Sequence, residues 1–140
     1  MSDRIGRITD TARDASGGSW VAFMLAGERF ALPMEAVDAV VPPPPLSRLP
    51  HTGAATLGAG NFAGRILPVL DLARLLDRPS GRRAYDGSGE ILRLRAQDGG
   101  VGLWIDRVDR LTRFAAGEAA PAGLTLLDPL PLLAAAGAPR

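Results

Sequence analysis

The chain contains no cysteine and no lysine, and it has a single histidine, His51. Without cysteine there can be no disulfide, no thiolate nucleophile and no cysteine ligand for zinc. One histidine alone cannot complete a zinc site of the usual histidine and cysteine type. No spacing of serine, histidine and aspartate suggests a nucleophilic triad. We therefore predict no catalytic residues, no metal and no cofactor.

Charge of one sign and long apolar runs are also missing. The sixteen basic residues, all arginine, and the fifteen acidic residues leave a formal net charge of +1. This balance argues against an electrostatic nucleic-acid binder. No apolar run approaches the roughly 20 residues that span a bilayer, and the N-terminus has no segment of signal-peptide length. We expect a cytoplasmic protein with no nucleic-acid partner and no direct membrane insertion.

Four segments share one pattern: a glycine, a short apolar strand, a proline or aspartate, and then apolar residues three to four apart. The proline or aspartate ends the strand or caps the next element. The change of period predicts a strand that runs into a helical turn or a short helix. We interpret Asp71, Asp106 and Asp128 as such caps and not as a carboxylate cluster. The segments are 27–40, 64–76, 102–111 and 123–133.

Further strand patterns lie between these segments. Residues 20–25 are bulky and end at a glycine, and residues 91–96 alternate, which predicts that Arg93 and Arg95 are exposed. Residues 97–100 are typical of a hairpin turn. We predict a mainly β fold with no helix longer than about four turns, in which the strands at 28–33, 64–69 and 101–105 are largely buried.

The most informative run is Thr56–Leu72, in which three glycines bracket Asn61 and Phe62 ahead of an apolar strand. The glycines predict a tight turn with positive φ, in particular at Gly64. Phe62 stands in a glycine-rich turn, which suggests an exposed or groove-lining aromatic ring. A strand comes directly afterwards instead of a helix, so the glycines do not form a phosphate loop.

This run resembles the signature of the CheW-like domain family, whose usual form is Asn-Leu-Arg-Gly followed by a strand ending in Pro-Val-x-Asp-Leu. Any one such motif is weak, but further segments resemble the family in the right order and together make the resemblance fairly specific. They are Phe23–Pro33, Val37–Val40, Val101–Val108 and Leu124–Leu133.

The resemblance implies a mainly β fold of two SH3-like β-barrel lobes that share a hydrophobic core, with short helices between strands. It implies a single domain over residues 19–136, preceded by a flexible arm over residues 1–18. The implied function is a non-catalytic adaptor of bacterial chemotaxis-type signalling. Its partners would be the cytoplasmic tip of a methyl-accepting receptor and the regulatory domain of a CheA-type histidine kinase. The predicted partner-binding residues are Val37, Val40, Leu57, Gly58, Asn61, Phe62 and Gly64.

Two departures from the family pattern bear on function. Ala63 and Ala39 stand where the family often has an arginine and an acid that pair, so a polar recognition feature is lost from both sides. The short stretch between Arg113 and Leu124 has low strand propensity, which predicts an abridged lobe with an exposed edge. The prolines at 42–45 suggest a stiff crossing between the lobes. A divergent role outside chemotaxis, or a small β-barrel enzyme or ligand-binding protein, remains as an alternative.

Overall fold

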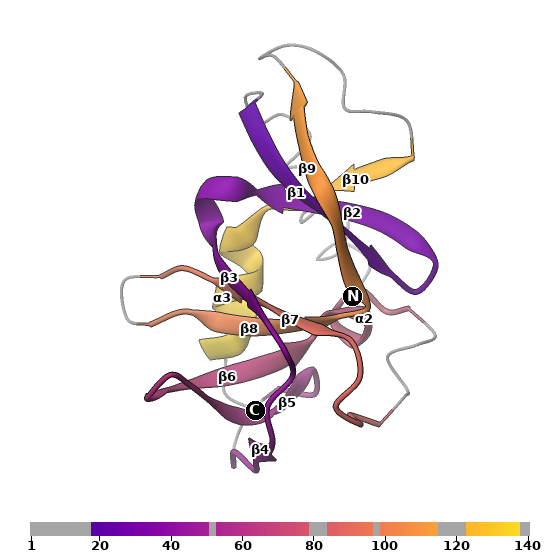
Figure 1. Cartoon of the computed structure of the whole chain (residues 1–140). Helices are drawn as coiled ribbons and strands as arrows, with labels where there is room; N and C mark the ends of the chain where they lie inside the picture. The colour runs from indigo at the N-terminus through magenta and orange to yellow at the C-terminus, as the bar shows by residue number, and fades with distance from the viewer. Residues whose placement is uncertain (1–17, 51–52, 79–83, 97–98, 115–122, 138–140) are drawn as a thin grey trace.

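The computed structural model describes residues 18–50, 53–78, 84–96, 99–114 and 123–137. His51, the segment 115–122 and the predicted arm up to residue 17 lie outside these ranges. Most of the described chain belongs to two β-sheets of four and six strands (Figure 1). The mainly β fold predicted from the sequence is therefore confirmed.

The four-stranded sheet is built from the two ends of the described chain. Its strand order is β10-β2-β1-β9. β1 pairs antiparallel with β2 and with β9, and the short β10 pairs parallel with β2. The bounds are Gly18–Leu25 for β1, Glu28–Pro33 for β2, Arg107–Phe114 for β9 and Leu124–Leu126 for β10.

The six-stranded sheet is built from the continuous stretch between them. Its order is β3-β7-β8-β6-β5-β4. The pairs are antiparallel except β6 with β8. The bounds are Val37–Val41 for β3, Leu46–Ser47 for β4, Thr56–Phe62 for β5, Arg65–Asp71 for β6, Glu90–Leu94 for β7 and Val101–Ile105 for β8.

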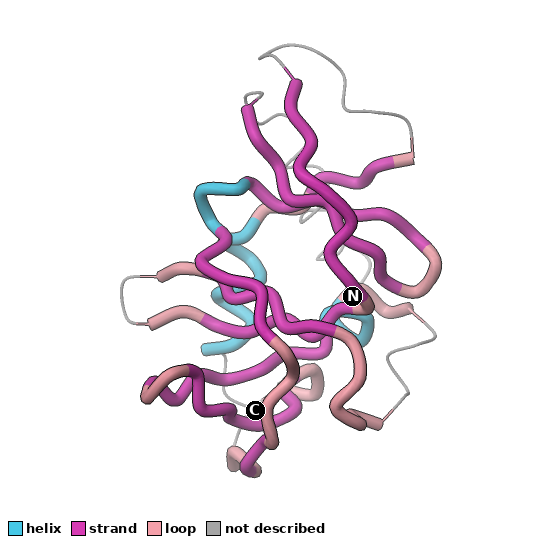
Figure 2. The backbone as a smooth tube through the Cα atoms, in the orientation of Figure 1, coloured by secondary structure: helices cyan, strands magenta, loops and turns pink. Residues whose placement is uncertain are grey.

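The helices are short, as Figure 2 shows. They are the 3-10 helix η1 (Met34–Ala36), α2 (Leu72–Leu75) and α3 (Pro129–Gly137). Among the described residues none exceeds the predicted four turns, and none is both long and apolar enough to cross a membrane.

The aspartate at the end of each strand acts in one of two ways. The carboxylate of Asp71 accepts the N–H of Arg74 at 3.2 Å and caps α2, and Asp128 accepts the N–H of Leu130 at 3.0 Å at the start of α3. Asp106 instead accepts the N–H of Ala26 at 3.1 Å, in the turn between β1 and β2. The predicted helical turn after Asp106 is wrong, because the residues after it form β9 and pair with β1.

The proline run at 42–45 connects β3 to β4, which are the two outermost strands of the same sheet. The prediction that it crosses between the lobes is therefore wrong. The chain passes from one sheet to the other through η1 instead, because β3 pairs with β7 before the prolines begin. The hydroxyl of Tyr85 donates to the carbonyl of Pro44 at 2.6 Å and holds the run in place.

Three hydrophobic clusters hold the molecule together. The largest lies between the sheets and takes side chains from both, together with α2 and α3. A second, around Trp20, lies on the other face of the four-stranded sheet. The third contains Phe62 and Trp104 and lies on the face of the six-stranded sheet that is turned away from the largest cluster. Both tryptophans are therefore packing residues, at 2% and 0% exposure.

The predicted burial is confirmed for β8, which is wholly buried, and for the centre of β2. It is wrong for 64–69, where only Leu67 and Val69 are buried, because the first residues of this stretch belong to the exposed tip of a hairpin. Arg95 is exposed, as predicted. Arg93 is not, because β3 brings Asp38 beside it and their side chains form an ion pair of 2.6 Å between Nη2 and Oδ2. The side chain of Arg93 is only 15% exposed.

Candidate functional site

The hairpin of β5 and β6 is the best-defined candidate. Phe62 pairs with Arg65, so only Ala63 and Gly64 form the turn. Their φ angles are 55° and 92°, and positive φ at both positions is the pattern of a type I′ turn. The side-chain oxygen of Asn61 accepts the N–H of Gly64 at 2.8 Å and closes the turn. The predicted positive φ of Gly64 is confirmed.

The side chain of Phe62 points into a hydrophobic cluster of the six-stranded sheet. It is 5% exposed and belongs to a buried cluster with Leu67, Val69, Ile91 and Trp104. A Cβ at Gly60 would lie 3.1 Å from its ring, which shows how closely the ring covers the backbone of its own strand. The expectation of an exposed ring is wrong, because Phe62 is the last residue of the strand and not part of the turn.

Gly58 allows β4 to approach β5. Its φ is 154°, and a Cβ there would lie 2.5 Å from the carbonyl oxygen of Ser47 on β4. The pairing register shifts between Thr56 and Gly58, as in a β-bulge. The half-buried Leu57 packs against the Phe62 cluster. Both residues therefore support the hairpin from within.

The surface of the hairpin comes from Asn61 and its cross-strand partner Ile66. Ile66 is 65% exposed and is one of five large apolar side chains that are exposed in the described ranges. Nothing in the sequence alone singles out Ile66, because it opens an apolar run that otherwise faces the core. That Ile66 faces away from the core becomes evident only once Asn61 is known to pair with it, since directly paired residues share a face of the sheet.

The two remaining predicted residues, Val37 and Val40, lie on β3. Val37 packs against the core between the sheets, whereas Val40 is 40% exposed. Met34, in η1 just before this strand, is 46% exposed. Met34 therefore lies where the chain passes from one sheet to the other, whereas Val40 lies farther along β3, paired with Leu92 of the six-stranded sheet. Figure 1 shows the passage from β2 to β3.

A polar network lies beside Ala39, whose cross-strand partner is Arg93. Asp38 binds Arg93, and its other carboxylate oxygen lies 3.4 Å from Arg95. Arg95 also donates to the carbonyl of Glu35 at 2.7 Å. Asp38 thus lies one residue before the position at which the family often has an acid, and its carboxylate is paired with Arg93 and Arg95.

Tyr85 and its surroundings are structural in character. Burial, and secondarily the negative charge of Asp86, raise the pKa of Tyr85. The ring packs edge-on against Trp104 at 5.0 Å between centroids. Because the hydroxyl donates to Pro44, the neutral phenol stabilises the connection between β3 and β4.

Comparison with known proteins bears on this arrangement. The profile of the CheW-like domain family matches residues 19–136. A relative from Helicobacter pylori, described as "Chemotaxis protein CheW", is 25% identical over 138 residues, which cover 91% of this chain and 82% of the relative. The crystal structure of scaffolding protein TtCheW from Thermoanaerobacter tengcongensis has a TM-score of 0.68 at 21% identity and covers 80% of this chain and 89% of that one. This likeness shows the fold: the two sheets form two SH3-like lobes.

Proposed function

Because the chain belongs to the CheW-like domain family, we propose that it is a non-catalytic adaptor that couples a methyl-accepting receptor to a CheA-type histidine kinase. The proposed partners are the cytoplasmic tip of the receptor and the regulatory domain of the kinase, which would place the adaptor in the cytoplasm. The observation that carries the proposal is the β5–β6 hairpin, which holds the exposed Ile66 on a strand next to a tightly closed turn.

The hairpin suits recognition because it is fixed before a partner arrives. The type I′ turn, the Asn61 hydrogen bond and the buried ring of Phe62 hold the strands in one arrangement. A fixed surface loses little conformational entropy on binding. We propose that Ile66 and Asn61 contact the kinase domain, and that Phe62 acts as their support.

The receptor surface is proposed along η1 and β3, where the chain enters the six-stranded sheet. Val40 and Met34 are exposed there, and an amphipathic receptor helix docks by inserting apolar residues into such a surface. Each contact is small, so we expect micromolar affinity, about −8 kcal/mol. Arrays of many copies would strengthen it through multivalency.

The proposal is tested with purified chain, a kinase regulatory domain and a receptor cytoplasmic fragment, by calorimetry. Ile66→Ser should weaken kinase binding at least about tenfold, and Val40→Ser should weaken receptor binding similarly. Leu111→Ser is the matched control, because Leu111 is 62% exposed but lies on β9 of the other lobe. Failure of the wild type to bind either partner would refute the adaptor proposal.

The replaced family pair offers a second test. Ala39→Glu together with Ala63→Arg should strengthen binding to a typical receptor tip, and Ala63→Arg alone should help less. Ala39 lies opposite Arg93, so the new acid would have a cation beside it even without the second change. If the double variant binds no better than the wild type, the missing pair does not govern receptor choice.

A divergent role outside chemotaxis is the alternative within the family. It would be favoured if the kinase regulatory domain bound and no methyl-accepting receptor did. An enzyme or small-ligand function would require convergent titratable side chains in a pocket. It would be favoured by a small molecule that raises the melting temperature at stoichiometric concentration.

A further inference from the structure

Three arginines gather around one carboxylate on the four-stranded sheet. Nε of Arg29 lies 3.1 Å from Oδ2 of Asp109, and guanidinium nitrogens of Arg107 and Arg110 lie 3.8 and 3.9 Å from the same carboxylate. Three positive charges thus face one negative charge. The nearby acids each have a partner: Glu28 is bonded to Arg78 at 3.1 Å, Glu90 accepts the N–H of Val108 at 2.6 Å and Asp106 accepts the N–H of Ala26 at 3.1 Å.

Two of these arginines retain free donors. Hydrogen bonds from guanidinium groups to carboxylates are normally about 2.7–2.9 Å long, so separations of 3.8 and 3.9 Å are ion pairs without a formed hydrogen bond. Within the described ranges no hydrogen bond is formed by the guanidinium of Arg107 or Arg110. Their side chains are 63% and 65% exposed, and Asp109 keeps both near one point.

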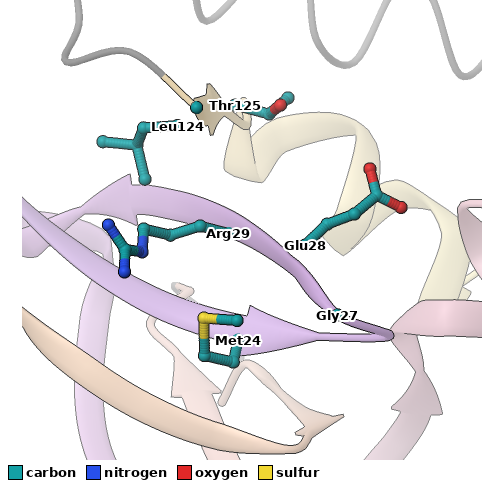
Figure 3. Close-up of a pocket in the computed structure, with 7 residues that line it drawn as sticks. Met24, Gly27, Glu28, Arg29, Leu124 and Thr125 are labelled. Carbon is teal, nitrogen blue, oxygen red and sulfur yellow. The ribbon is translucent and has the colours of Figure 1, made fainter.

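The register of the sheet places an open cleft beside these charges, with a mainly polar lining in which Met24 and Leu124 are the large apolar side chains. Directly paired residues share a face, and one such row crosses all four strands from β9 to β10: Arg107, Met24, Arg29 and Leu124. Met24, Arg29 and Leu124 line an open cleft of about 610 Å³, together with Gly27, Glu28, Gly123 and Thr125. Figure 3 shows the Glu28 carboxylate and the Arg29 guanidinium directed away from each other.

We propose that this row, together with the neighbouring Arg110 on β9, is a second recognition site, which binds an acidic segment of a partner protein in extended form. Carboxylates of the segment would pair with Arg107 and Arg110, which present the fork geometry that suits them. An apolar side chain of the segment would enter the cleft between Met24 and Leu124. The site includes none of the β5–β6 hairpin residues, so it does not depend on the adaptor function proposed above.

The full chain can be titrated with a short synthetic peptide of alternating glutamate and leucine residues. The variant Arg107→Gln with Arg110→Gln should bind this peptide at least about tenfold more weakly, because two charge-assisted contacts are lost. The charge-matched control is Arg48→Gln with Arg65→Gln, because both residues are exposed and lie by β4 and on β6 of the other sheet. It should bind within about twofold of the wild type, since screening limits distant surface charges.

Two further arms fix the occupant and the place. A peptide with serine in place of leucine should bind at least about tenfold more weakly if an apolar side chain enters the cleft. Hydrogen exchange should slow in 24–29 and 107–110 on binding. Unchanged melting temperatures exclude misfolding of the variants, and Arg107→Lys with Arg110→Lys should restore part of the affinity.

Several results would overturn the proposal. The site itself would be refuted by no binding to the wild type, by equal losses in the two glutamine double variants, or by unchanged exchange in both segments. Equal binding of the serine peptide, or full competition by inorganic phosphate at equal charge, would show a general anion patch and overturn the proposed occupant.

Discussion

The turn of the β5–β6 hairpin permits a clean measurement of backbone strain. A Cβ at Gly64 would meet no atom within 4 Å, so Gly64→Ala adds no steric contact beyond its own backbone. Its φ of 92° is a conformation that costs an L-residue about 1–2 kcal/mol. We expect Gly64→Ala to lower the free energy of unfolding by about 1–2 kcal/mol, and Gly64→Val by more than that, since β-branched residues tolerate positive φ least.

Ala63 should respond in the opposite direction. It already holds a φ of 55°, so a glycine there relieves a backbone strain of about 1–2 kcal/mol. Against this, glycine loses more conformational entropy on folding, which costs about 0.5–1 kcal/mol. Ala63→Gly should therefore stabilise the protein by up to about 1 kcal/mol, and Ala63→Asn by about as much, because asparagine is preferred in this turn.

Urea unfolding of each purified variant gives the free energies. Gly53→Ala is the control, because a Cβ at Gly53 also meets nothing within 4 Å and its φ is not in the positive range. It should be neutral or stabilising by about 0.4–1 kcal/mol. If Gly64→Ala were as stable as Gly53→Ala, the turn would not hold the positive φ on which this prediction depends.

Three further results are expected. Phe62→Ala should cost about 3–5 kcal/mol of unfolding free energy because it empties a buried cluster, whereas Ile66→Ala should stay within about 0.5 kcal/mol; similar values for the two would contradict their opposite faces. Gly58→Ala should cost at least about 2 kcal/mol through its approach to Ser47, and it should weaken protection of β4 amides from exchange, which a purely local strain would leave unchanged. The raised pKa of Tyr85 means that its contribution is complete below pH 10.0 and is lost as pH rises through the folded-state pKa; ultraviolet difference spectra of this single tyrosine should show a midpoint above 10.0, and Tyr85→Phe should remove the alkaline loss of stability.

Local chemistry makes much of the fold predictable. A glycine, an apolar run and a breaker specify where a strand begins and ends, so β2, β6 and β8 lie where the sequence pattern predicts them. The caps at Asp71 and Asp128 arise from the same rule, because a side chain that accepts a nearby N–H needs no distant partner.

The features that the sequence does not predict depend on distant partners. Arg93 alternates as an exposed residue should, yet Asp38 lies 55 residues away and pairs with it. Residues after Asp106 carry apolar spacing compatible with a helix, but β1 offers a full set of backbone partners. The sequence does not show where β5 ends and the turn begins, so its glycine-rich pattern places Phe62 in the turn. An error of one residue at this boundary moves a side chain from one face of the sheet to the other.

The order of strands along the chain also has a consequence for biosynthesis. The six-stranded lobe occupies one uninterrupted stretch, whereas the other lobe needs β1 and β2 from the start of the described chain and β9 and β10 from its end. On the ribosome, every strand of the six-stranded lobe is therefore made before β9. At that point the four-stranded lobe consists of the β1–β2 hairpin alone. A nascent chain would carry the β5–β6 hairpin before Arg107, Arg110 and Leu124 of the proposed second site have been translated. The two proposed recognition surfaces thus come into being in sequence, the hairpin first.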